Sequence, residues 1–178
     1  PSCHSRKTRI ECGHPEASEA KKAWGLAVAA LEKSKPGVFG FSIPHGIRRS
    51  RVPVFLVCGP PGAGKSTLIK ERAAPDDVKV DFDDYLKEVG GAKWSTDHLK
   101  VKAAFRLRDE ALRALANRTR GAAWIIAVAP TTAERQAWKA ALGRVTVIML
   151  DVPAETCKVR IRADSQRKHA IEKMCAAV

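Results

Sequence analysis

The sequence has no apolar run near the ~20 residues that a membrane-spanning helix needs. Its amino-terminal stretch is polar and contains no apolar core of the kind found in signal peptides. We therefore predict a cytoplasmic protein without a membrane segment. The chain also begins with Pro1 rather than methionine, and we expect it to be a fragment or a processed form.

Cysteines and acidic residues are both scarce. The five cysteines are scattered and odd in number, which argues against a disulfide framework. There are 19 Asp and Glu against 32 Lys and Arg, giving a net charge of +13. This excess indicates either an anionic partner, with nucleic acid as the first candidate, or a solvated basic surface. Hydrophobic residues make up 45% of the 178 residues, enough for the core of one medium domain with an appendage.

Residues 59–67 read Gly-Pro-Pro-Gly-Ala-Gly-Lys-Ser-Thr and match the Walker A pattern of a phosphate-binding loop (P-loop), G-x-x-x-x-G-K-[ST]. The apolar run Val52 to Cys58 predicts a strand before the loop, and residues 68–72 predict a helix after it. The alternative is a glycine-rich turn that binds nothing. The four matched positions and both flanks favour nucleotide binding.

Each part of this loop has an expected contact with ATP and Mg²⁺. Backbone N–H groups of the loop, and of the helix beginning at about Lys65, should face the phosphates. Lys65 would bridge the β- and γ-phosphates, Ser66 would bind Mg²⁺, and Thr67 would support Ser66. The predicted nucleotide-binding residues in the loop are Gly59, Pro60, Pro61, Gly62, Ala63, Gly64, Lys65, Ser66 and Thr67.

Three further apolar runs predict strands at Val78 to Phe82, Trp124 to Val128 and Val145 to Leu150, the last two buried. Helices are expected at about 97–120 and, after a capping box, from Thr131 to Leu142. Strands alternating with helices around a P-loop predict a right-handed, three-layer α/β/α sandwich of the P-loop NTPase type, with a parallel sheet of about four strands.

The long helix at 97–120 has one apolar face and one basic face. The expected core residues are Leu99, Val101, Ala104, Phe105, Leu112 and Leu115. The expected outer residues are Lys100, Lys102, Arg106, Arg108, Arg113, Arg118 and Arg120. This outer face would either be solvated or line a nucleic-acid path.

Two adjacent carboxylates, Asp83 and Asp84, follow the second predicted strand. They should therefore lie at the carboxyl edge of the sheet, where open α/β folds bind ligands. The alternative role for such residues is helix capping. We assign Asp83 to function and Asp84 to the cap of the following helix.

The first 51 residues are expected to form a separate segment, followed by the P-loop domain at 52–178. Residues 3–8, Cys-His-Ser-Arg-Lys-Thr, resemble the closing end of an HNH endonuclease motif whose other parts are missing, so we expect no nuclease activity. A small zinc site would need Cys3, His4, Cys12 and His14, at an unfamiliar spacing. A helix is predicted at 15–34, then a linker ending in Arg48-Arg49-Ser50-Arg51 that is either solvated or touches a phosphate backbone.

Residues 52–168 resemble the P-loop kinases, and among them the 5′-kinase domains of bacteriophage polynucleotide kinases. Beside the loop, the resemblance includes Val-Asp-Phe-Asp-Asp-Tyr at 80–85, Glu-Arg-Gln-Ala-Trp at 134–138, and Asp-Val-Pro at 151–153 followed by Arg160. It implies the strand order 2-3-1-4 and ATP with Mg²⁺ as cofactors. It also implies Asp83 as general base and Arg160 as a lid arginine on the donor phosphates, so that Lys65, Asp83 and Arg160 form the predicted catalytic set.

Two positions depart from that family. Residues 127–130, Ala-Val-Ala-Pro, stand where the family has Asp-Thr-Asn. The family's second lid arginine would fall at Asp164, so Arg162 or Arg167 would have to contact the nucleotide instead.

Three functions remain open. The first is a kinase that phosphorylates a 5′-hydroxyl end of nucleic acid, and the second is a small-molecule or nucleotide kinase of the same fold. The third is an ATP-binding regulatory module of an HNH nuclease. The sequence leaves both the acceptor and the oligomeric state undetermined.

Overall fold

The computed structural model describes residues 43–92, 95, 97–129 and 131–164. Cys3, His4, Cys12, His14, the helix expected at 15–34 and Arg167 lie outside these residues. The elements are β1 (Val54–Cys58), α2 (Lys65–Arg72), β2 (Val78–Val80), α3 (Phe82–Glu88), α4 (His98–Ala114), β3 (Ala123–Ala127), α5 (Thr132–Leu142), β4 (Val145–Met149) and α6 (Ala154–Ala163).

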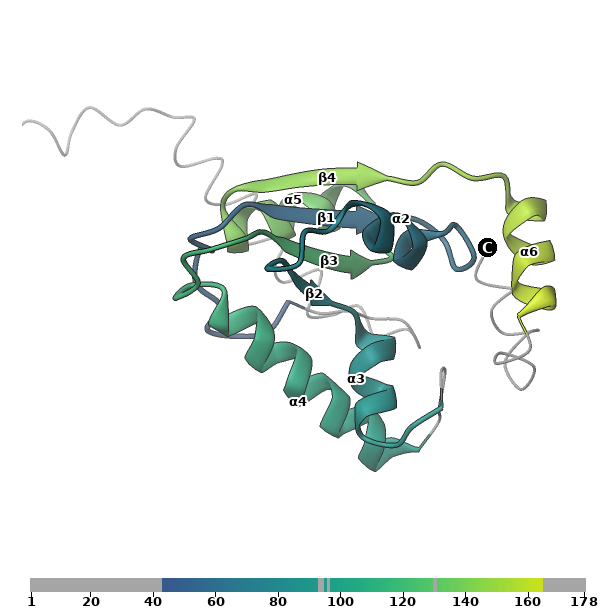
Figure 1. Ribbon diagram of the computed structural model, residues 1–178, viewed down its shortest axis with the longest axis horizontal. Helices are drawn as coiled ribbons and strands as arrows, with labels where there is room; N and C mark the ends of the chain where they lie inside the picture. The colour runs from purple at the N-terminus through teal and green to yellow at the C-terminus, as the bar shows by residue number, and fades with distance from the viewer. Residues whose placement is uncertain (1–42, 93–94, 96, 130, 165–178) are drawn as a thin grey trace, which may run out of the picture. The chain divides into compact units, whose positions relative to one another are not determined.

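The four strands form one parallel sheet in the order β2-β3-β1-β4, which confirms the predicted order (Figure 1). Val54, the first residue of β1, is in register with Ala123 of β3 and Val145 of β4. All strands therefore start at one edge of the sheet, the amino edge, and end at the carboxyl edge. The P-loop, the start of α3 and the start of α6 follow strand ends and come together at the carboxyl edge (Figure 1).

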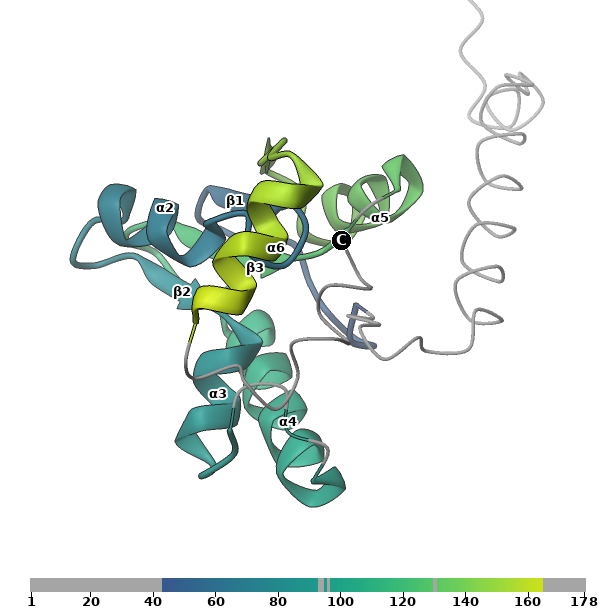
Figure 2. The same cartoon turned by 90° about the vertical axis from the view of Figure 1, so that its right-hand side faces the viewer.

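Helices cover both faces of the sheet, with α2 on one side and α5 on the other (Figure 2). The alternation of β1 explains this, because successive side chains of a strand point to opposite faces. Val57 packs with Ile69 of α2 and Trp124 in one cluster. Leu56, on the other face, belongs to the main core cluster with residues of α4 and α5. The three-layer α/β/α architecture is thereby confirmed.

The predicted faces of α4 were partly wrong. Leu99 is 78% exposed, whereas Arg108 is only 4% exposed. The helix packs against α3, and the rings of Phe82 and Phe105 lie 4.5 Å apart. Arg108 lies over the Phe105 ring at 4.8 Å and pairs with Asp109 at 2.6 Å, so its charge is retained in a buried position. The sequence analysis therefore assigned Arg108 to the outer face, whereas in the structure its guanidinium packs against Phe105.

Two strand predictions also need correction. β2 ends at Val80 instead of continuing to Phe82, because Asp81 already caps α3. β4 was expected to be buried, but it is the edge strand of the described sheet and Met149 is 44% exposed. Along the described residues, no helix has the length and apolar character to cross a membrane.

Asp77 ties the start of β2 to β3. Its carboxylate accepts hydrogen bonds from Ala122 N at 2.6 Å, Trp124 Nε1 at 2.7 Å and Ala74 N at 2.9 Å. Burial alone would raise the pKa of Asp77, but these hydrogen bonds and the charge of Arg118 outweigh it and hold the pKa below its ordinary value. The deprotonated form therefore stabilises this corner of the sheet.

Candidate active site

The P-loop is pressed closely between the end of β4 and α6. Gly59 has φ of +147°, and a Cβ there would lie 2.9 Å from the carbonyl oxygen of Leu150. Gly62 has φ of +78°, and its Cβ would lie 2.6 Å from the carbonyl oxygen of Cys157. Both positions thus require glycine for backbone conformation and for space. Gly64, the second fixed glycine of the motif, has φ of +95°, so it requires glycine for its backbone conformation.

Lys65, the first residue of α2, reaches back across the loop. Its ammonium donates hydrogen bonds to the carbonyl oxygens of Gly59 at 2.7 Å and Pro60 at 2.8 Å. Gly64 is the N-cap residue of α2 and offers no side chain to its N–H groups, and the first turn contains no acidic residue. The positive end of the helix therefore faces the loop without a protein carboxylate from this turn to compete with a phosphate.

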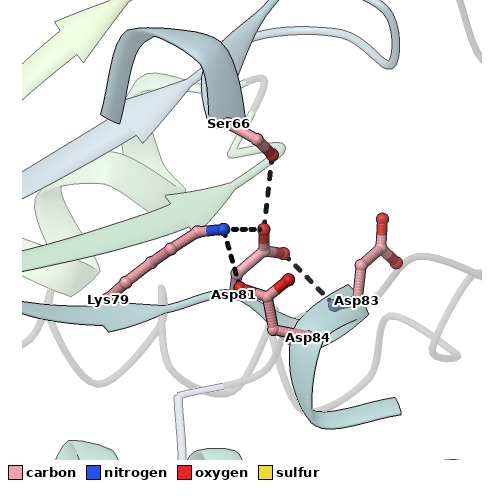
Figure 3. Close-up of polar contacts among 5 residues, drawn as sticks. All are labelled: Ser66, Lys79, Asp81, Asp83 and Asp84. Carbon is pink, nitrogen blue, oxygen red and sulfur yellow. Dashed lines mark hydrogen bonds and ion pairs between the residues drawn. The ribbon is translucent and has the colours of Figure 1, made fainter. Parts of the chain in front are cut away.

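Ser66 contacts a carboxylate that the sequence analysis did not assign. Its Oγ donates a hydrogen bond to Asp81 Oδ2 at 3.3 Å (Figure 3). Asp81 is 6% exposed and directly follows β2, so its side chain lies at the carboxyl edge beside the loop. The missed signal was the strand length: with β2 ending at Val80, Asp81 is the first carboxylate beyond the strand.

Asp81 also corrects the predicted capping residue. The N-cap of α3 is Asp81, whose Oδ1 accepts a hydrogen bond from Asp83 N at 3.2 Å. Asp84 is not the cap; it lies within the first turn, and its Oδ2 pairs with Lys79 Nζ at 2.7 Å. The side chain of Asp83 extends from the same turn on the side away from Lys79 (Figure 3). Asp83 is therefore at the expected edge, and its role as a base stays a prediction.

Lys79 joins two of these carboxylates, because it also lies 3.1 Å from Asp81 Oδ2. Burial alone would lower the pKa of Lys79, but the hydrogen bond to Asp84 and the charge of Asp81 outweigh it and raise the pKa above its usual value. Lys79 is thus a cation, and Asp81 is shared between this cation and the Ser66 hydroxyl. Burial, together with the nearby charges of Glu88, Asp84 and Asp81, raises the pKa of Tyr85.

The start of the expected lid lies against the loop. Cys157 and Ile161 of α6 are buried, while Arg160 is exposed and donates from Nη1 to the carbonyl oxygen of Gly62 at 3.4 Å. Arg162 is exposed on the same helix. The structure therefore brings Arg160 to the loop.

The segment after β3 has an unusual backbone. Ala129 has φ of 36°, and its carbonyl oxygen accepts a hydrogen bond from Arg135 Nη1 at 2.8 Å. Trp138, one turn further along α5, is buried at 4% exposure. The Arg-x-x-Trp pair identified in the sequence therefore packs α5 and fixes this segment. No acidic side chain occurs at 127–129, so this part of the edge is small and apolar.

Comparison with known proteins agrees with this geometry. The model of the AAA_33 family, described as an AAA domain, matches residues 54–176. The chain belongs to this family. The matched range of the AAA domain includes the whole parallel sheet, the P-loop and α6, and it confirms the predicted P-loop kinase-like domain. No curated protein matches the chain.

Two solved structures are similar to this AAA domain. A chain of the Pnkp1/Rnl/Hen1 RNA repair complex is 20% identical, with a TM-score of 0.54 over 76% of this chain and 46% of that chain. The present chain thus matches about half the length of that protein. Shikimate kinase from Acinetobacter baumannii is 20% identical, with a TM-score of 0.45 over 71% of this chain and 74% of that chain. At these identities the likeness concerns the fold alone.

Proposed function

We propose that this AAA domain is an ATP-dependent phosphotransferase that uses Mg²⁺ and phosphorylates a 5′-hydroxyl end of nucleic acid. The observation that supports it most is the hydrogen bond from Ser66 of the P-loop helix to buried Asp81 at the end of β2. It joins a phosphate-binding loop to a carboxylate edge that also holds Asp83.

The loop and Lys65 would bind the polyphosphate of ATP. Backbone N–H groups of residues 62–67, at the end of the loop and the start of α2, suit an anion, and Lys65 would exchange its two carbonyl partners for phosphate oxygens. Arg160, at the Gly62 carbonyl, is close enough to the loop to contact a bound phosphate after a small side-chain movement. Arg162 and Arg167 are further candidates for this contact.

Ser66 and Asp81 fit a magnesium site. A hydroxyl and a carboxylate are the protein ligands that Mg²⁺ takes beside phosphate oxygens and water in P-loop proteins. Among the described residues, no group of three or more His, Cys, Asp or Glu is arranged to hold a metal, so phosphates and water would complete the set. When bound, Mg²⁺ would neutralise charge on the β- and γ-phosphates.

Asp83 would serve as the base in the transfer. The hydroxyl oxygen of the acceptor attacks the γ-phosphorus, the bond to the β,γ-bridging oxygen breaks, and ADP leaves with that electron pair. The hydroxyl proton passes to the Asp83 carboxylate, which the first turn of α3 holds at the same edge as the loop. The segment at the end of β3, Ala-Val-Ala at 127–129, has no polar side chain that would select a particular acceptor group.

Nucleic acid is the preferred acceptor because of the net charge of +13 and because a chain of an RNA repair complex has this fold. The alternatives remain a kinase for a small molecule or nucleotide, and an ATP-binding regulatory module of an HNH nuclease. The deciding experiment incubates the protein with γ-labelled ATP, Mg²⁺ and a panel of 5′-hydroxyl oligonucleotides, nucleosides and sugars. Label on oligonucleotides alone supports the proposal, whereas label only on small molecules, or ATP binding without transfer, favours one of the alternatives.

A further inference from the structure

We infer that the amino edge of the sheet is a docking surface for the phosphate backbone of a nucleic acid, distinct from the P-loop site. The inference does not rest on the proposed phosphotransferase activity. Its basis is a set of exposed arginines that four separate segments bring to this edge, here called the basic edge. The set comprises Arg48, Arg49, Arg51, Arg113, Arg120 and Arg144.

Strand register places three of these arginines near one another. Val54 N donates a hydrogen bond to Arg144 O at 3.0 Å, and Val54 is in register with Ala123. Arg51 and Arg120 each precede these paired residues by three positions. Because β3, β1 and β4 are neighbouring parallel strands about 4.8 Å apart, the segments that contain these three arginines enter the sheet side by side at its amino edge. Figure 1 shows their segments together at the end of the sheet opposite α6.

The arginine-rich run at 48–51 is fixed to the domain. Ser50 is buried, and its N–H donates to Leu142 O at 2.9 Å, while Arg51 N donates to Leu115 O at 3.2 Å. The run is therefore held between the ends of α4 and α5. The end of the expected linker is thus bonded through the backbone of residues 50–51 to two helix ends, while Arg48, Arg49 and Arg51 stay exposed.

Two more contacts extend the surface. Arg113 Nη2, near the end of α4, donates to the carbonyl oxygen of His45 at 3.4 Å. The side chain of Arg49 lies beside Gly143, in the turn before Arg144. The basic edge therefore runs from the last turn of α4, along residues 45–51, to the turn between α5 and β4.

Within the described part of the chain, carboxylates do not form ion pairs with the arginines of the basic edge. The ion pairs among the described residues involve Lys79, Lys100, Arg108 and Lys158, and none involves an arginine of the basic edge. Asp77, the nearest carboxylate before β2, is engaged by Ala74, Ala122 and Trp124. Asp76 is exposed, its backbone carbonyl accepts a hydrogen bond from Arg118, and its carboxylate forms no ion pair with another described residue. Like charges held together in this way repel one another, and a polyanion would relieve that repulsion.

The spread of the arginines favours a nucleic-acid backbone over a single small anion. Arginine forks match phosphate geometry, and several of them along an edge can contact successive phosphates of one strand. Phosphate contacts contain no sequence information, so the binding should be independent of sequence. The basic edge and the P-loop lie at opposite ends of β1, so binding here should not require ATP.

The test measures binding of a fluorescent, single-stranded 20-mer RNA that already has a 5′-phosphate, without ATP, at several salt concentrations. The variant replaces Arg48, Arg51, Arg120 and Arg144 with Gln. We expect at least a tenfold rise in Kd at 0.1 M salt. The slope of log K against log salt should fall by up to about 2.8, because each single-strand phosphate contact contributes about 0.7.

The matched control replaces four exposed basic residues elsewhere, Lys70, Arg72, Lys87 and Lys102, with Gln, and it should retain most of the affinity. Lysine at the four basic-edge positions should restore part of the binding and the salt dependence, because the charge is kept although the fork geometry is lost. If the fourfold Gln variant does not fold, single Arg144→Gln should still lower the slope by about 0.7. Equal loss in the control, an unchanged slope in the variant, or binding of polyglutamate but not RNA would overturn the inference.

Discussion

Ser66 and Asp81 are 15 residues apart in sequence, yet the Ser66 hydroxyl donates a hydrogen bond of 3.3 Å to the Asp81 carboxylate. The contact connects the first turn of α2 with the N-cap of α3, two helices that start at the carboxyl edge of the sheet. It accounts for why a serine follows the lysine of the loop and why the chain places a buried acid at the end of β2.

Asp81→Asn tests the metal role of this pair. Asparagine caps a helix about as well as aspartate, so α3 should be retained while the charge is lost. We expect the Mg²⁺ concentration for half-maximal ATP binding to rise at least tenfold, with metal-free nucleotide binding little changed. Calorimetry with and without Mg²⁺ measures both, and Asp84→Asn serves as control. Equal shifts in the two variants would show that Asp81 has no special contact with the metal.

Lys79→Met tests whether Lys79 competes with the metal for Asp81, from which it lies 3.1 Å away. Methionine keeps much of the length and apolar stem while removing the ammonium. We expect the variant to need less Mg²⁺, by several-fold, because the carboxylate loses a competing cation. Titration of Mg²⁺ into the ATP complex of the parent, of Lys79→Met and of the exposed control Lys87→Met measures this. A higher Mg²⁺ requirement in Lys79→Met would instead mean that Lys79 positions Asp81 for the metal.

Asp77→Asn tests the tie between β2 and β3. The variant loses charge-assisted hydrogen bonds, and we expect a loss of about 1 kcal/mol in the free energy of unfolding at neutral pH. Because the folded state lowers the pKa of Asp77 below its ordinary 3.8, the parent's advantage is present above that value. It should disappear as the pH falls below 3.8 and through the folded pKa. Urea unfolding of both proteins across pH 3 to 7 is the measurement, and a pH-independent difference would contradict this role.

Arg160→Ala tests the lid. Arg160 donates to the Gly62 carbonyl of the loop, so it is positioned to reach a phosphate during transfer. We expect turnover to fall roughly 10²–10³-fold, as when one donor to a transition-state oxyanion is removed, while ADP affinity falls much less. Arg162→Ala, at another exposed position of α6, is the comparison. A proportional fall in turnover and ADP affinity would restrict Arg160 to ground-state binding.

Much of this architecture was predictable from local chemistry. The helices, the strands and the P-loop fold were predicted from the Walker A sequence, the capping box at Thr131 and Glu134, and the apolar runs. The strand order was predicted from the resemblance to P-loop kinases. The capping box is present, with Thr131 Oγ1 accepting from Glu134 N at 3.2 Å. These signals lie within a few consecutive residues, and they use combinations of residue types that are uncommon outside these two motifs.

The errors came from contacts that are distant in sequence. Asp81 was assigned to the interior of β2 because that strand was predicted two residues too long. Its role beside the P-loop depends on its contact with Ser66, which is distant in sequence. Arg108 is charged, and its stacking on Phe105 and its pairing with Asp109 are compatible with its burial. The edge position of β4 was already contained in the predicted strand order 2-3-1-4, but burial was inferred from the apolar residues of the segment alone.

The most direct test of the account is transfer of label from γ-labelled ATP to a 5′-hydroxyl oligonucleotide by the parent, Lys65→Ala and Asp83→Asn. We expect the parent to transfer and Lys65→Ala to lose transfer together with ATP affinity, because the loop loses its charge on the phosphates. Asp83→Asn should lose at least ~10²-fold in transfer, the low end of general-base effects, with ATP affinity nearly unchanged. If the parent binds ATP but transfers no label to the oligonucleotide, or if Asp83→Asn transfers as fast as the parent, the account is contradicted.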